Sequence, residues 1–263
     1  MPTNLDFKCA LVTGGAGGIG LALARYFLSK GKKVIICGRT EEKLRTALSG
    51  PLKACAGYYV LDTGNTAKIP AFIAKVTKDH PDLDCLVNNA GIQQPLRLLQ
   101  DDPTTLLAKA DEEIAINVTG PMHLAVGLLE HFQTQSSATI INVSSVLGFI
   151  PLEIINPVYN GTKAWLHAWT MSLRVQLRDS GIKVVEIVPP LVETDLHRGR
   201  IDPDDNKKHK NATALTMEEF MEEITEKLER GETTITAGLG NAVVAKWFES
   251  YEDRLAKAAS SWQ

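Results

Sequence analysis

The sequence predicts a single α/β domain built on a doubly wound, Rossmann-type parallel sheet that is flanked by helices. Three observations predict it: short apolar runs rich in β-branched residues, longer helix-compatible segments between them, and a glycine-rich turn after the first run. Continuous apolar runs are typical of strands buried on both faces. Their alternation with helices implies right-handed crossovers within a parallel sheet. The 263 residues show no internal repeat or low-complexity linker, so one domain covering 1–263 is expected.

Six strands are expected along the chain, each of them a short apolar run. They cover residues 9–12, 34–37, 58–61, 83–87, 139–143 and 184–188. The clearest helices are expected at 21–29, 164–178, 217–228 and 241–259. Ligands bind such sheets at the carboxyl ends of the strands, so the residues that follow each strand are the candidate site.

The predicted domain has two halves with different tasks. Residues 1–150 are expected to form the cofactor-binding half, and residues 138–263 the catalytic and substrate-binding half. The strongly polar stretch 202–210 follows the last expected strand. It predicts a mobile lid over a substrate cleft, covering about 195–231, or alternatively a solvated surface loop.

Composition and charge narrow the classes of ligand. The net charge is −3 with a pI near 6.1, and Lys and Arg are scattered, which argues against a nucleic-acid partner. No apolar run reaches membrane-spanning length and the N-terminus lacks a signal-peptide pattern, so we expect a cytoplasmic protein with no membrane partner. Without C-x-x-C or H-E-x-x-H spacing, neither disulfides nor a metal site is expected.

The glycine-rich turn at 13–20 predicts a dinucleotide site. Gly14, Gly18 and Gly20 lie between the first expected strand and the first helix. Glycine permits a tight turn and lets backbone N–H groups approach a pyrophosphate at the helix N-terminus. Other strand-to-helix turns also use glycine, so the pattern gains weight from its position.

The second expected strand indicates which dinucleotide binds. It is followed by Arg39 rather than by the acidic residue that would bind the ribose 2′-hydroxyl of NAD. A guanidinium can pair with a 2′-phosphate, so NADPH/NADP+ is favoured over NAD(H). Alternatively, Arg39 forms a surface salt bridge. Asp62, after the third strand, is a candidate for binding the adenine amino group, or else caps the helix that follows.

Tyr159 and Lys163 carry the predicted proton-transfer chemistry. Their spacing of four places both on one helix face. Free tyrosine has a pKa of about 10, and a neighbouring ammonium stabilises the phenolate. Ser145 ends another strand, where its hydroxyl can hold a carbonyl oxygen beside the tyrosine. Ser144 is the alternative for this position.

Together these motifs resemble the short-chain dehydrogenase/reductase family. The matching residues occur in the family's order from about residue 7 to residue 196, and residues 174–178 and 184–194 are most similar to DltE-like oxidoreductases. The motifs are the turn 13–20, Asn88-Asn89-Ala90-Gly91, Asn117, Ser145, Tyr159 and Lys163.

The resemblance implies a catalytic tetrad of Asn117, Ser145, Tyr159 and Lys163. Tyr159 would protonate the substrate carbonyl oxygen, Ser145 would polarise that carbonyl, and Lys163 would bind the nicotinamide ribose and lower the pKa of the tyrosine. Asn117 would organise a helix kink and a water; alternatively it only caps or breaks a helix. Further cofactor contacts are implied for Ile19, Asn89, Val192 and Thr194, although Thr194 also fits a helix N-cap.

The predicted function is NADPH-dependent reduction of a ketone or aldehyde, reversible as oxidation of a secondary alcohol. The alternative is an NADP(H)-binding protein with a non-redox role, as a cyclase, isomerase or regulatory scaffold. Gln93, Gln94, residues 147–156 and the loop beyond Thr194 are expected to wall a pocket for a bulky, largely apolar small molecule. The family's pairing of two long helices, here 120–132 and 158–178, implies a homodimer or homotetramer.

Overall fold

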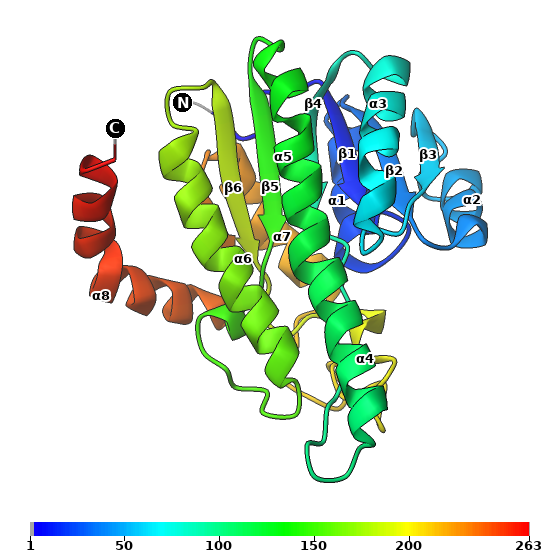
Figure 1. Ribbon diagram of the computed structural model, residues 1–263, viewed down its shortest axis with the longest axis vertical. Coiled ribbons are helices and arrows are strands. Elements are labelled where there is room, and N and C mark those ends of the chain that lie inside the picture. Colours follow the sequence, from blue (N-terminus) through cyan, green and yellow to red (C-terminus); the bar gives the residue numbers. More distant parts are fainter. Residues whose placement is uncertain (1–2, 263) are drawn as a thin grey trace.

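A seven-stranded, fully parallel sheet forms the centre of the molecule, with helices on both faces (Figure 1). It is seen in a computed structural model that describes residues 3–262. The strand order is β3-β2-β1-β4-β5-β6-β7. The chain builds the sheet outwards from β1 to β3, then crosses back to add β4 on the other side of β1. The predicted doubly wound fold is confirmed.

The strands lie close to the predicted positions. The third begins one residue earlier than expected, because Gly57 pairs with Ile35. The fifth and sixth also extend towards their N-terminal ends. The strands are β1 (Cys9–Thr13), β2 (Lys33–Gly38), β3 (Gly57–Val60), β4 (Leu83–Asn88), β5 (Ala138–Val143), β6 (Ile182–Val188) and β7 (Thr234–Thr236).

The expectation of six strands was wrong by one, because β7 was missed. β7 has three residues, and it pairs with β6 through Glu186–Thr234, Ile187–Ile235 and Val188–Thr236. A run this short carries too little hydrophobic periodicity to be recognised in sequence.

Two predicted helices begin earlier than expected. The first begins at Gly18 rather than at residue 21, and the sixth at Pro157, one residue before the long helix expected at 158–178. Proline is well suited to the first turn of a helix because the missing N–H has no partner there. The helices are α1 (Gly18–Ser29), α2 (Glu41–Ser49), α3 (Ile69–Asp79), α4 (Pro103–Ile114), α5 (Gly120–Gln133), α6 (Pro157–Gln176), α7 (Met217–Glu229) and α8 (Gly240–Ser260). None of them, within residues 3–262, is long and apolar enough to cross a membrane.

Two hydrophobic cores cover the two faces of the sheet. On one face, Phe27 of α1 and Phe220 of α7 are fully buried. On the other, Leu124 and Phe132 of α5 pack with Phe72 of α3. The sheet therefore holds its strand ends rigidly, and the loops after β4, β5 and β6 gather along one edge, at the bottom of Figure 1.

The polar stretch 202–210 is packed against the body of the protein at Asn206, which is 1% exposed. Its side-chain amide donates to the carbonyl oxygens of Val192 and Thr194. The helix that follows, α7, buries Phe220 and Ile224 in the core. A lid would therefore have to be confined to about 195–213, and we retain it as a proposal for those residues.

Candidate active site

A cavity of about 620 Å³ runs along the carboxyl ends of the strands, on both sides of the β1–β4 crossover. One end is formed by the glycine turn and the other by the loops after β5 and β6. It brings together ten of the residues singled out from sequence: Gly14, Gly18, Ile19, Arg39, Asn89, Ser145, Tyr159, Lys163, Val192 and Thr194.

The glycine turn has the conformation that a phosphate cradle requires. Gly14 and Gly18 have φ of +64° and +50°, which residues with a side chain rarely adopt. A Cβ on Gly20 would collide with Asn89 Nδ2 and the carbonyl oxygen of Gly14, so Gly20 serves close packing behind the cavity rather than lining it. A Cβ on Gly17 would meet no described atom within 4 Å, which leaves this side of the turn open. These residues fit a dinucleotide pyrophosphate at the start of α1.

Arg39 lies at the edge of the cavity, just after β2. Its Nη1 donates to Glu112 Oε1 at 3.0 Å, and both side chains are almost half exposed. Asp62 does not line the cavity; its carboxylate accepts the N–H of Gly64 at 3.0 Å. Of the two residues, Arg39 but not Asp62 therefore lines the cavity together with the glycine turn.

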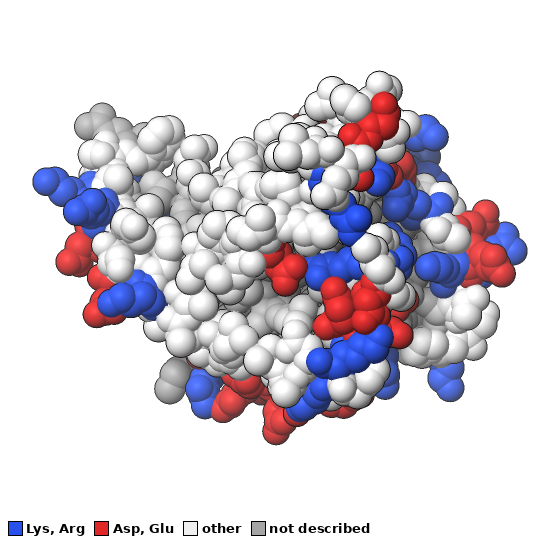
Figure 2. Space-filling model, turned by 90° about the horizontal axis from the view of Figure 1, so that it is seen from below, with Lys and Arg blue, Asp and Glu red and all other residues white. Residues whose placement is uncertain are grey.

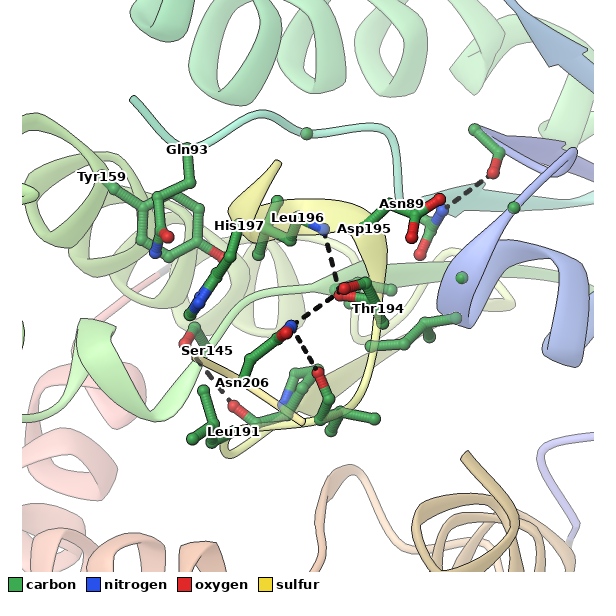
Figure 3. A pocket seen from close by; sticks show the side chains of 18 of the residues that line it. Asn89, Gln93, Ser145, Tyr159, Leu191, Thr194, Asp195, Leu196, His197 and Asn206 are labelled. Carbon is green, nitrogen blue, oxygen red and sulfur yellow. Dashed lines mark hydrogen bonds between the residues drawn. The ribbon is translucent and has the colours of Figure 1, made fainter. Parts of the chain in front are cut away.

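Ser144 and Ser145 differ in their hydrogen-bond partners, and these partners show which serine faces the cavity. The Ser144 hydroxyl donates to Glu186 Oε1 at 2.6 Å inside the core. Ser145 Oγ accepts the Leu147 N–H at 3.2 Å and lies near the phenol of Tyr159, where it lowers the pKa of that phenol. Ser145 is therefore the serine available to a ligand (Figure 3).

Tyr159 and Lys163 occupy one face of the first turns of α6 and are 5% and 4% exposed. Lys163 Nζ lies 5.6 Å from the Tyr159 ring centroid and donates to the Val143 carbonyl oxygen at 2.7 Å. Burial raises the pKa of Tyr159 above its usual range, and Glu113 raises it further. Ser145 and Arg200 lower this pKa, but burial outweighs them, so the net shift is opposite to the lowering that was expected from Lys163. Burial also lowers the pKa of Lys163, to about 8.

Asn117 stands behind the cavity, in a π-helical turn (Ala115–Thr119) between α4 and α5. Its Nδ2 donates to the Ile92 carbonyl oxygen at 2.8 Å and to Thr162 Oγ1 at 3.2 Å, and its Oδ1 accepts the Ile92 N–H at 3.0 Å. Asn117 thus ties the loop after β4 to α6. It is more than a helix cap, and it holds the backbone beside Lys163 in place.

The loop after β6 closes the cavity opposite Tyr159. Val192 pairs with Leu215 in an isolated bridge, and the Thr194 hydroxyl accepts the Leu196 N–H at 3.3 Å. Thr194 is therefore the N-cap of a short 3₁₀ turn and also lines the cavity. Figure 3 shows Asn206 holding this loop from behind through two backbone carbonyl oxygens.

The substrate end contains Gln93, which was expected in the pocket wall, and His197 from the loop beyond Thr194. Both side chains point towards the space next to Tyr159 (Figure 3). Behind them, Arg200 donates to Gln93 Oε1 at 2.9 Å, to Glu153 Oε2 at 3.0 Å and to Asp205 Oδ2 at 2.7 Å. These contacts join three loops that are remote in sequence, and no local sequence pattern predicts the contacts.

Part of the predicted pocket wall lies elsewhere. Gln94 does not line the cavity, because its amide donates to Glu112 and to the Lys109 carbonyl oxygen on α4. Of residues 147–156, Leu147, Leu152 and Glu153 line the cavity.

Comparison with known proteins settles the family. Residues 8–205 match the short chain dehydrogenase family. The chain belongs to the short-chain dehydrogenase/reductase family. This confirms the prediction made from the motifs, and the chain is an oxidoreductase of that family.

Two curated relatives of this short-chain dehydrogenase/reductase match most of its length. It is 35% identical to "Uncharacterized oxidoreductase DltE" of Bacillus subtilis, over 92% of this chain and 94% of the relative. It is 31% identical to the "NADP-dependent 3-hydroxy acid dehydrogenase" of Schizosaccharomyces pombe, over 89% and 92%. A short-chain dehydrogenase from Sphingobium yanoikuyae, solved in complex with NADPH, has the same fold, with a TM-score of 0.81 at 23% identity over 98% and 97% of the two chains.

Proposed function

We propose that this protein is an NADPH-dependent carbonyl reductase that also oxidises secondary alcohols. The observation that carries the proposal is the convergence of the Ser145 and Tyr159 hydroxyls in one cavity with the glycine turn and Arg39. The NADP dependence and hydroxy-acid chemistry in the name of the fission-yeast relative support the same class of cofactor and reaction. In this assignment a bound NADPH supplies the hydride.

The side chains have distinct tasks in the proposed reaction. Ser145 donates a hydrogen bond to the substrate carbonyl oxygen and orients it beside Tyr159. Tyr159 gives its proton to that oxygen, and its raised pKa keeps the proton on the phenol until the oxygen becomes basic. Lys163 stabilises the phenolate that remains. Asn117 holds the loop that follows β4 in place against α6.

For the cofactor end, we propose that Gly14, Gly18, Ile19 and Asn89 hold the pyrophosphate and the adenosine ribose. Arg39 would pair with the 2′-phosphate, and Val192 and Thr194 would contact the carboxamide. We propose no adenine contact for Asp62, because its carboxylate turns back to Gly64.

The substrate end favours a bulky, largely apolar carbonyl compound. Leu147, Leu152 and Leu196 line it, together with a few polar groups. Seen from below, towards the edge where the strands end, uncharged side chains cover the surface left of the centre, and charged side chains gather to the right of it (Figure 2).

The test is turnover of NADPH with a panel of bulky ketones, aldehydes and 3-oxo acids. Tyr159→Phe should lower kcat by roughly 10²- to 10⁴-fold and still bind NADPH, which fluorescence titration measures. Tyr251→Phe, at a half-exposed tyrosine of α8, is the matched control. Unchanged turnover in Tyr159→Phe would remove Tyr159 from the mechanism. Tight NADPH binding with no consumption across the panel would favour a non-redox role.

A further inference from the structure

Glu113 is a buried carboxyl group that the proposed reaction does not use. It lies on α4, one helical turn before Asn117, and is 0% exposed. Neither carboxyl oxygen has a hydrogen-bond partner among residues 3–262. The Gln94 N–H faces the carboxyl without forming a hydrogen bond of normal geometry. An ionised carboxylate in such a place is very costly, which favours the protonated, neutral form of this carboxyl.

The groups that face Glu113 belong to the catalytic pair. Lys163 on α6 is near enough for its charge to favour the ionised carboxylate, and Tyr159 on α6 is near enough to be affected by that carboxylate. On α4 itself, Glu112 acts in the opposite direction to Lys163. No ion pair within 4.0 Å joins Glu113 to Lys163 in the described chain, so Lys163 acts on Glu113 through its charge and not by direct contact.

The packing around Gly91 shows how close Asn117 lies to Lys163. A Cβ on Gly91 would lie 3.2 Å from Asn117 Oδ1 and 3.8 Å from Lys163 Nζ. Asn117 and Lys163 thus flank the same stretch of backbone, and Glu113 lies one turn away from Asn117 on the same helix face. Glu113 is fully buried and does not line the cavity, so its carboxyl lies in the protein interior and not in the space open to a ligand.

Glu113 and Lys163 change their charge over a similar range of pH. Burial raises the pKa of Glu113 to about 8 and lowers that of Lys163 to about 8. Glu186, behind Lys163, favours the ammonium, and Arg200 favours the phenolate of Tyr159. Near neutral pH, Glu113 is protonated and neutral; at higher pH it places a negative charge behind Tyr159.

We propose that Glu113 is a positioning residue that acts through Tyr159 and Lys163: a buried acid whose ionisation sets the pH at which Tyr159 exchanges its proton with substrate. The inference rests on the proposed function for its effect on catalysis. When Glu113 is ionised, its charge opposes formation of the phenolate and retains the ammonium of Lys163. Alcohol oxidation, which needs the phenolate, is thereby held to higher pH.

The first test is the pH profile of kcat/KM for alcohol oxidation. Glu113→Gln removes the charge at almost constant volume and should move the rising limb to lower pH by roughly one unit. Glu113→Asp keeps the carboxyl and should restore a limb near that of the wild type. Asp111→Asn removes the same charge from an exposed site on α4 and should not move the limb. Superimposable profiles for the wild type and Glu113→Gln would overturn the proposal.

The second test does not depend on turnover. An infrared difference spectrum between wild type and Glu113→Gln should show the carbonyl stretch of a protonated carboxylic acid at about pH 6, and lose it at about pH 10. The same band, followed by pH titration of the wild type, covers the case in which Glu113→Gln does not fold. A carboxylate already ionised at about pH 6 would overturn the proposal even in an active enzyme. If the band is present but no carbonyl compound is reduced, the proposed function fails instead.

Discussion

Arg39 Nη1 donates a 3.0 Å hydrogen bond to Glu112 Oε1, so the guanidinium assigned to the cofactor phosphate has an acidic partner in the cofactor-free chain. A 2′-phosphate must compete with that partner or share the guanidinium with it. Because both side chains are almost half exposed, the pair contributes at most about 1 kcal/mol. Competition between Glu112 and the 2′-phosphate for Arg39 should therefore lower NADPH affinity by a small but measurable amount.

Glu112→Gln should strengthen NADPH binding by up to roughly fivefold, because it frees Arg39 and removes a charge that repels phosphate. Arg39→Ser should weaken NADPH binding and leave NADH binding almost unchanged. Dissociation constants of both cofactors for the two variants check this. Equal losses of NADPH and NADH affinity in Arg39→Ser would place Arg39 away from the 2′-phosphate.

Stability should fall as the pH rises from about 5 to about 8, through Glu113. The pKa of its carboxyl is raised from 4.5 to about 8 in the folded protein. Between these values the folded chain holds a proton that the unfolded chain has lost, so raising the pH favours unfolding. Urea unfolding of wild type and Glu113→Gln across this window measures the difference. Parallel pH dependences in the two proteins would contradict the assignment.

Arg200→Gln should loosen the substrate end without affecting the cofactor end. The Arg200 side chain is 11% exposed and joins Gln93, Glu153 and Asp205. Its loss leaves two carboxylates without their cation, so we expect KM for substrate to rise roughly tenfold with NADPH affinity unchanged.

The exposed ion pair of Lys210 with Asp202, in the same segment, provides the control for Arg200→Gln. Lys210→Gln should change neither constant. Hydrogen exchange of residues 195–213, with and without substrate, then tests the proposed lid. Equal exchange in both states would argue against a lid that closes on substrate.

Phe220→Ala should destabilise the protein by about 3–5 kcal/mol, because Phe220 is fully buried where α7 packs on the sheet. Glu222→Ala, at an exposed position of the same helix, should change the free energy of unfolding by less than about 0.5 kcal/mol. Chemical unfolding measures both. A small effect of Phe220→Ala would mean that α7 is not part of the core. The lid could then extend to residue 231, as the sequence predicted.

The sequence contained most of the fold because the strands are buried on both faces and read as continuous apolar runs. Ser145, Tyr159 and Lys163 were found for a similar reason: each lies at a strand end or on one helix face, where spacing determines position. Glu113 could have been noticed four residues before Asn117, but its burial depends on how α4 packs against α6. The contacts of Arg200 join segments more than forty residues apart, and no local pattern encodes them.

The segment 103–133 forms one continuous helical rod in Figure 1, with a π-helical turn at Ala115–Thr119. A π turn accommodates one residue more than an α turn, so α4 and α5 are out of phase by about 100°. The geometry of the site consequently depends on the number of residues in this turn as well as on their identities. Deleting one residue other than Asn117 from this turn would leave every catalytic side chain in the chain and the sheet intact, yet turn α4 by about 100° relative to α5 and so move Glu113 relative to Lys163 on α6.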